Sequence, residues 1–152
     1  MRLGQSTNSS PCEYEMQEKF CEWLDSRGLR YIDELRVKEV KRIADFIVLK
    51  SGNGLINIEA KCDDFACMIK QLDDHSKYCN YSFAFIQSRS ITPKLFKRKL
   101  SDKGYGLIIF NWETREITEV LEAHRNKVEL KNLNTKVTRQ IVEKYEQQEL
   151  KL

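Results

Sequence analysis

A predicted β-hairpin, residues 42–61, lies at the centre of this chain and has the sequence RIADFIVLKSGNGLINIEAK. Its two ends are rich in Ile, Val, Leu and Phe, which favour strands, and the Ser-Gly-Asn-Gly segment between them is a strong turn signal. We therefore predict two antiparallel strands joined by a tight turn. Three charged side chains interrupt the apolar runs: Asp45, Glu59 and Lys61.

The length of the turn decides where these charges lie. Side chains alternate across a strand, so Glu59 and Lys61 share one face. A three-residue loop centred on Gly52 places Asp45 opposite Glu59 on that face. A two-residue loop shifts the register by one residue and separates the two carboxylates. We predict the first register.

Two carboxylates and an ammonium group in apolar strands are costly unless a ligand compensates their charges. Asp45 and Glu59 offer the oxygen ligands that suit Mg²⁺, which takes one or two protein carboxylates and keeps several waters. Lys61 would then hold the attacking water or stabilise developing negative charge. The competing interpretation is a solvent-exposed Glu59–Lys61 ion pair at the end of an edge strand.

This Asp-x(13)-Glu-x-Lys pattern resembles the active site of the PD-(D/E)XK nuclease superfamily. Ala44-Asp45 takes the place of "PD", without the proline, and Glu59-Ala60-Lys61 is the "(D/E)XK" element. Glu13 and Gln17 upstream and Gln71 downstream make the arrangement similar to the VRR-NUC-type and Holliday-junction-resolvase-type branches.

The resemblance covers roughly residues 10–90 and implies a restriction-endonuclease-like domain that hydrolyses DNA phosphodiester bonds. Mg²⁺, with Mn²⁺ as a substitute, would be held by Asp45, Glu59 and the Ala60 carbonyl. The catalytic residues that the resemblance implies are Asp45, Glu59, Lys61, Glu13 and Gln71.

A helix that starts at Ser10 could supply the helical carboxylate of these branches. Ser10, Pro11 and Glu13 form a capping-box pattern, which gives Glu13 a plain structural role. At 100° per residue, Glu13 and Gln17 also lie on the apolar face, whereas Glu15 and Glu18 point away. Helix geometry thus favours Glu13 supported by Gln17 over Glu18, and capping alone remains the alternative.

Clusters of basic residues provide candidate phosphate contacts. The KEVKR segment lies at the mouth of the hairpin, and five basic residues fall within ten positions near residue 98. Both clusters could equally be solvated surface; as phosphate contacts they would give salt-sensitive, non-specific affinity. The predicted nucleic-acid-binding residues are Lys38, Lys41, Arg42, Gln17, Lys97, Arg98 and Lys99.

The remaining pattern predicts an α/β domain with a central mixed sheet flanked by helices and a C-terminal helical tail. Expected strands cover residues 29–37, 82–87, 107–112 and 115–121, and a helix covers 65–79, after the cap residues Asp63 and Asp64. Thr92-Pro93 opens a further helix, with Leu95, Phe96 and Leu100 inside. We divide the chain into a flexible lead-in (1–9), the nuclease-like domain (10–123) and a polar extension (124–152). Its helix, about 134–148, has a stripe too narrow for a core helix; it could pack lightly on the domain, pair with another chain or lie along DNA.

Composition indicates the cellular compartment of the protein more clearly than its function. A net charge of +3 is compatible with nucleic acid but does not select it. Five cysteines without metal-site spacing argue against a disulfide framework, and the chain has no apolar run of membrane-spanning length and no signal peptide. We expect a reducing, cytoplasmic setting, DNA as partner and no membrane, with a homodimer left open. Lone His75 is expected on the surface.

Two functions follow from these residues. The first is a Mg²⁺-dependent DNA endonuclease that acts in DNA repair, recombination or the processing of mobile-element DNA. The second is a nucleic-acid-binding or assembly module on the same fold without catalysis. Cleavage in a Mg²⁺ titration separates them.

Overall fold

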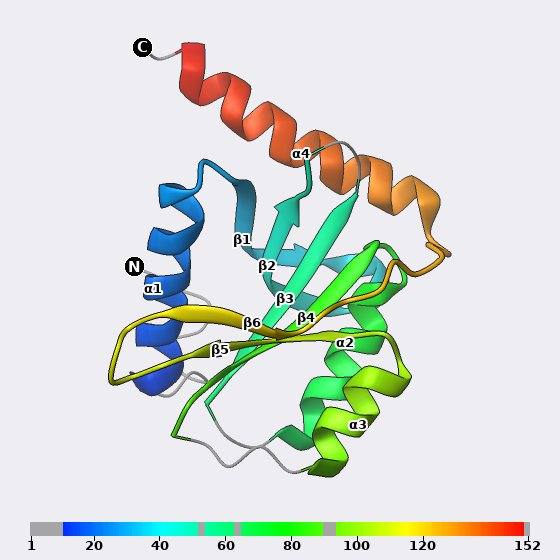
Figure 1. The fold of residues 1–152 in the computed structure, drawn as a ribbon. Helices are drawn as coiled ribbons and strands as arrows, with labels where there is room; N and C mark the ends of the chain where they lie inside the picture. The colour runs from blue at the N-terminus through cyan, green and yellow to red at the C-terminus, as the bar shows by residue number, and fades with distance from the viewer. Residues whose placement is uncertain (1–10, 52–53, 63–64, 90–93, 151–152) are drawn as a thin grey trace.

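The computed structural model describes residues 11–51, 54–62, 65–89 and 94–150, and in them a six-stranded mixed sheet is flanked by helices (Figure 1). The strands are β1 (Arg30–Val37), β2 (Arg42–Leu49), β3 (Leu55–Lys61), β4 (Tyr81–Gln87), β5 (Gly106–Phe110) and β6 (Ile117–Leu121). The helices are α1 (Pro11–Ser26), α2 (Met68–Ser76), α3 (Lys94–Asp102) and α4 (Lys131–Leu150), with short 3-10 helices η1 (Lys38–Val40) and η2 (Phe65–Cys67). The predicted fold class is confirmed.

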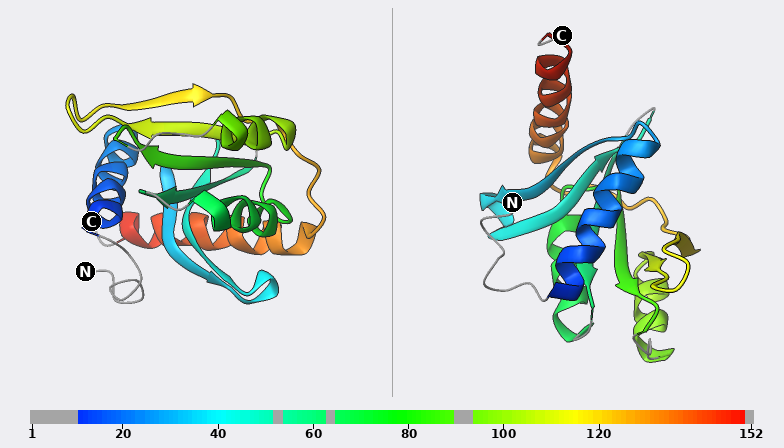
Figure 2. Two further views of the ribbon diagram at one scale, coloured as in Figure 1. Left: turned by 90° about the horizontal axis from the view of Figure 1, so that it is seen from below. Right: turned by 90° about the vertical axis from the view of Figure 1, so that its left-hand side faces the viewer.

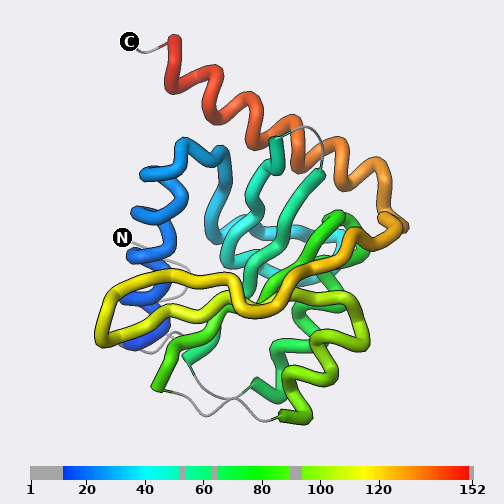
Figure 3. The backbone as a smooth tube through the Cα atoms, viewed as in Figure 1, coloured from blue at the N-terminus to red at the C-terminus, as the bar shows by residue number. Residues whose placement is uncertain are grey.

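The strands lie in the sheet in chain order, β1 to β6, as the trace of the chain makes visible (Figure 3). β1, β2 and β3 are antiparallel, β3, β4 and β5 are parallel, and β6 is antiparallel to β5. Because parallel neighbours need a crossover, α2 connects β3 to β4 and α3 connects β4 to β5. β3 is therefore an interior strand.

The predicted hairpin and its register are confirmed. Phe46 pairs with Ile58 and Leu49 with Leu55, and the Lys50 N–H donates to the Gly54 carbonyl at 2.9 Å. Continued by one residue, this register sets Asp45 opposite Glu59. The two candidate carboxylates, Asp45 and Glu59, therefore come from adjacent strands at the same end of the sheet.

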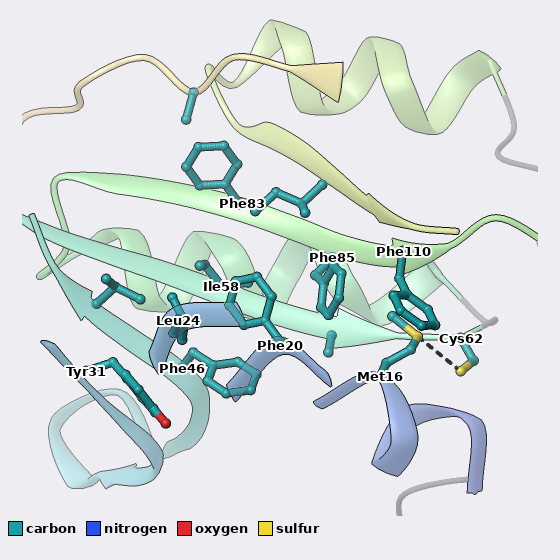
Figure 4. Close-up of a cluster of buried hydrophobic side chains, with 14 residues drawn as sticks. Met16, Phe20, Leu24, Tyr31, Phe46, Ile58, Cys62, Phe83, Phe85 and Phe110 are labelled. Atoms are coloured by element: carbon teal, nitrogen blue, oxygen red, sulfur yellow. Dashed lines mark hydrogen bonds between the residues drawn. The ribbon is translucent and has the colours of Figure 1, made fainter. Parts of the chain in front are cut away.

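One face of the sheet is covered by α1, whose Met16, Phe20 and Leu24 are fully buried (Figure 4). The Phe20 ring centroid lies 4.9 Å from that of Phe46 on β2 and 4.7 Å from that of Phe85 on β4. Aromatic pairs at such spacing contribute roughly 0.5–1.5 kcal/mol each beyond their buried area. This packing fixes the first turns of α1 beside the carboxyl end of β3.

The other face is covered by α2, α3 and α4 (Figure 2). Leu133, Val137 and Ile141 of α4 are buried against β1, β2 and β3. The interpretation of this stripe as too narrow for a core helix is therefore wrong: the sheet supplies the partner surface that the helix sequence alone does not reveal. Of the three open placements for this helix, packing on the domain is the one observed.

Helix ends agree with the sequence in part. Gly28 adopts φ +65°, and the N–H groups of Gly28 and Leu29 bond to the carbonyls of Asp25 and Leu24, a Schellman ending. α2 is shorter than predicted because Phe65–Cys67 is a 3-10 turn and the helix ends at Ser76. On α3, Phe96 and Leu100 are buried as predicted, but Leu95 is 60% exposed.

A disulfide joins Cys12 on α1 to Cys62, which follows β3, across a Cα–Cα distance of 6.2 Å. This pair is contrary to the prediction that the cysteine count argues against disulfides, because pairing depends on a tertiary approach of residues 50 positions apart that a count does not reveal. Cys62 Sγ also lies 3.4 Å from Met16 Sδ, a sulfur–sulfur contact without a proton to share (Figure 4). Disulfides are commonest in oxidising compartments, so this pair is at odds with the predicted reducing setting.

None of the helices within the described ranges is long and apolar enough to cross a membrane. Some predicted features lie outside those ranges: the lead-in 1–9, the Ser10 cap, the cap residues Asp63 and Asp64, and Thr92-Pro93.

Candidate active site

A cavity of about 650 Å³ opens where the start of α1, the carboxyl end of β3, the β1–β2 connection and α2 meet. It brings together all the residues predicted to be catalytic or metal-binding and part of the predicted phosphate contacts. Its lining is Glu13, Gln17, Arg36, Val37, Lys38, Lys41, Arg42, Ile43, Asp45, Glu59, Ala60, Lys61 and Gln71.

Each of the carboxylates of Asp45 and Glu59 accepts a hydrogen bond from a backbone N–H of the neighbouring strand. The Ala60 N–H donates to Asp45 Oδ2 at 2.8 Å, and the Asp45 N–H donates to Glu59 Oε2 at 3.1 Å. β2 and β3 thus exchange side-chain bonds beyond the last backbone pair, Phe46 with Ile58. Each carboxylate accepts its bond through one oxygen, which holds both groups at the cavity wall.

Glu59 is almost fully buried, with 2% of its surface exposed. Burial raises its pKa well above the usual value, and the neighbouring Asp45 charge raises it further. Bonds from Asn57 and Asp45 and the charge of Lys61 act in the opposite direction. The competing interpretation of an exposed ion pair on an edge strand is therefore wrong, because β3 is an interior strand and Glu59 is almost fully buried.

Lys61 Nζ lies 3.7 Å from Glu13 Oε1, across the cavity between β3 and α1. Glu13 is 9% exposed and Gln17 2%, whereas Glu18 is exposed and Glu15 pairs with Arg115 at 2.8 Å. The helix face predicted to meet the sheet is thus the observed one. Capping by Glu13 involves Ser10, outside the described residues.

His75 was expected on the surface, and this prediction is wrong. The ring is fully buried beneath Glu59, with Nε2 3.9 Å from Glu59 Oε1 and Nδ1 2.6 Å from the Tyr78 hydroxyl. Burial lowers the pKa of His75 to about 4, so the ring is neutral at pH 7. Within the described residues Nε2 has no hydrogen-bond partner, and Glu59 Oε1 is the carboxylate oxygen it faces.

Asn57 is a second residue that sequence reasoning missed. It is fully buried, and its Nδ2 donates to Glu59 Oε2 at 2.8 Å. Strand alternation could have revealed it, since it lies two positions before Glu59 on the same face. His75 had an equivalent signal, four positions after Gln71 on the same helix face.

Basic side chains line the open side of the cavity. Lys38 and Lys41 are exposed and make no ion pair with any residue of the described ranges, while Arg42 is held by Asp74 through a 2.8 Å Nε–Oδ2 bond. Arg36 is a further exposed cation that the sequence did not single out.

The three predicted phosphate contacts on α3 do not line this cavity. Lys97 and Arg98 border a different depression beside β5 and β6, and Lys99 is also exposed.

The carboxylates of Asp45 and Glu59 suit a hard cation, although they do not form a complete coordination site by themselves. Within the described ranges no group of three or more His, Cys, Asp or Glu side chains is arranged to hold a metal ion. Two carboxylates with backbone and water ligands are nevertheless a usual set for Mg²⁺. Buried Glu59 supports this fit: burial raises the pKa of its carboxyl group, and a cation bound beside it would lower that pKa again.

No protein-family model and no curated protein matches the sequence. Among solved structures, a protein of unknown function from Silicibacter pomeroyi, SPO1766, is similar with a TM-score of 0.64 and 16% sequence identity. The match covers 94% of this chain and 90% of that one. This similarity supports the fold and says nothing about the activity.

Proposed function

We propose that this protein is a Mg²⁺-dependent nuclease that hydrolyses DNA phosphodiester bonds with a site similar to that of the PD-(D/E)XK superfamily. One observation carries the proposal. The buried side chain of Glu59, on an interior strand, accepts a hydrogen bond from the backbone N–H of Asp45 and lines a cavity whose lining also includes exposed cations. A structural role alone does not account for burying Glu59 with a raised pKa beside a second carboxylate.

We assign each cavity residue a role from its position. Asp45, Glu59 and the Ala60 carbonyl would hold the metal, which, when bound, acts as a Lewis acid and lowers the pKa of bound water. The Lys61 ammonium group, near Glu13, would orient the attacking water and stabilise negative charge on the phosphate.

The other cavity residues would position the substrate. Lys38 and Lys41 would contact flanking phosphates, and their contribution should fall as the salt concentration rises. Gln17 and Gln71 carry amide groups that can donate to a phosphate oxygen.

Asp45→Asn provides the direct test. It keeps an oxygen able to accept the Ala60 bond, so folding should survive, but it removes the negative charge. We expect loss of Mg²⁺ binding by calorimetry and loss of DNA cleavage together. Asp102→Asn on exposed α3 is the matched control and should leave both unchanged.

A non-catalytic binding module is the second candidate, favoured by the lack of a three-side-chain metal cluster in the part of the chain described. It predicts DNA binding in chelator with no cleavage at any Mg²⁺ or Mn²⁺ concentration. The nuclease proposal fails if that is the result with folded parent protein.

A further inference from the structure

A second cavity, of about 960 Å³, lies at the opposite end of β2 and β3 and is bordered by the start of β1 and by α4. It shares no lining residue with the candidate active site. Asp45 and Lys50 mark the two ends, five residues apart on one chain segment, or roughly 17 Å at the usual strand rise. We call this second cavity the distal groove.

The distal groove is lined by four cations and no carboxylate among the described residues: Arg30, Lys50, Arg125 and Arg139. The whole chain carries 26 Lys and Arg against 23 Asp and Glu, so a lining that followed the overall composition would hold bases and acids in nearly equal numbers. All four cations are exposed. The groove therefore has a local positive potential that the nearly balanced chain does not have.

Most of this charge is not neutralised. Lys50, Arg125 and Arg139 form no ion pair within the described ranges, and Arg30 has only a long contact, 3.8 Å, with exposed Glu149. An exposed pair of this kind contributes little and is readily exchanged.

Aromatic rings contact three of the four cations. Lys50 Nζ lies 4.3 Å and Arg125 Cζ 5.7 Å from the centre of the Tyr81 ring, and an Arg125 Nη1 contact of 3.5 Å reaches the Tyr81 hydroxyl. Arg30 Cζ lies 5.8 Å from the Tyr145 ring centre. The charges thus surround the groove from four chain segments, and a ligand with several spaced anions fits them better than one small anion.

Three of the four cations are arginines, whose planar guanidinium group matches the two oxygens of a phosphate. We propose that the distal groove binds the phosphate backbone of a nucleic acid, so that one strand is held both here and at the catalytic cavity. The choice of nucleic acid over another polyanion rests on the proposed function.

The test measures DNA binding in chelator, where no cleavage occurs. Arg125→Gln combined with Arg139→Gln removes two groove charges from exposed positions. Lys127→Gln combined with Lys131→Gln is the matched control, because these exposed lysines lie outside both cavities and form no ion pair within the described ranges. Fluorescence anisotropy with a labelled duplex of about 30 base pairs, near three helical turns, gives the affinity at several salt concentrations, and thermal melting checks folding.

We expect the groove variant to lower the slope of log affinity against log salt by about 2, one for each lost phosphate contact, and the control by clearly less. An unchanged slope, or an equal fall in the control, overturns the proposal. So does displacement of the DNA by polyglutamate at an equal concentration of charge, since the groove would then be a general polyanion site.

The two proposals fail separately. If Mg²⁺ gives no cleavage but the groove variant shows the expected lower salt slope, the nuclease proposal fails and the groove proposal holds. If cleavage occurs and the groove variant binds like the parent, only the groove proposal fails.

Discussion

The Asp45 N–H donates to Glu59 Oε2 at 3.1 Å, so the backbone of one candidate metal ligand holds the side chain of the other. This bond couples the register of the hairpin to the geometry of the site. A shift of β2 by one residue would turn Asp45 to the other face and leave Glu59 buried without that donor. The apolar runs that determine the register of the hairpin therefore also determine how Asp45 and Glu59 lie relative to each other.

His75 makes a measurable contribution to the pH dependence of stability. Its pKa is about 4 in the fold and near 6.5 in an unfolded chain, so the unfolded chain binds the proton more readily between these values. Its stabilising contribution is complete above pH 6.5 and is lost as the pH falls towards 4, up to roughly 3 kcal/mol. Urea unfolding between pH 4 and 7 measures this loss when the parent is compared with a variant that lacks the ring.

His75→Gln is the control for that loss. It removes the titrating ring while Glu59, whose raised pKa acts in the opposite direction, is present in both proteins. The difference in unfolding free energy between parent and variant should shrink as the pH falls. A difference that stays constant with pH would mean that His75 does not titrate as its burial requires.

The Cys12–Cys62 disulfide should stabilise the fold next to the site. It closes a loop of 50 residues, for which chain entropy gives roughly 4 kcal/mol. A reductant should therefore lower the unfolding free energy of the parent by up to that amount. Cys12→Ala should begin at the lower value and not respond to reductant, whereas Cys21→Ala should behave like the parent. Five reactive thiols in the oxidised parent would contradict the pairing.

The strand pair and its charged residues could be predicted because the information is local. Turn composition and strand alternation are sufficient to bring Asp45 opposite Glu59, and helix periodicity is sufficient to turn Glu13 and Gln17 towards them. Strand order was not predictable, since it depends on which segments pair across the chain.

The errors share the same cause. His75 follows two aspartates and looks exposed, yet Glu59 of β3 lies against its ring, and Tyr78, three residues further along the chain, contacts its other nitrogen. The α4 stripe and the Cys12–Cys62 pair likewise depend on tertiary neighbours. Periodicity describes one element at a time and cannot show what packs against it.

The basic surface of α3 is a separate candidate contact with DNA. Replacing Lys97, Arg98 and Lys99 together with Gln should weaken binding to all sequences and reduce the salt slope by about 3. Since none of these residues lines the cavity, the cleavage rate at saturating DNA should be unchanged. A salt slope equal to that of the parent would exclude this helix from the interface.

Lys61 separates catalysis from binding. Lys61→Ala leaves Asp45 and Glu59 in place, so Mg²⁺ and DNA affinity should change little. Cleavage should fall by about 10² to 10³, the usual cost of removing one preorganised electrostatic group. Single-turnover cleavage at saturating DNA and Mg²⁺ measures this loss directly, because it excludes binding and product release.

Stability decides how a loss in Lys61→Ala is interpreted. Its ammonium group partly offsets the cost of burying Glu59, so removing it could unfold the protein and imitate a catalytic defect. Lys61→Met keeps the apolar stem and loses only the charge, and Lys136→Ala, at an exposed ion pair with Glu39, controls for loss of a surface lysine. If folded Lys61→Met binds Mg²⁺ and cuts DNA at the parent rate, Lys61 has no catalytic role and the motif assignment is wrong. Slow cleavage by a folded protein with parent-like melting and Mg²⁺ affinity assigns the loss to the chemical step.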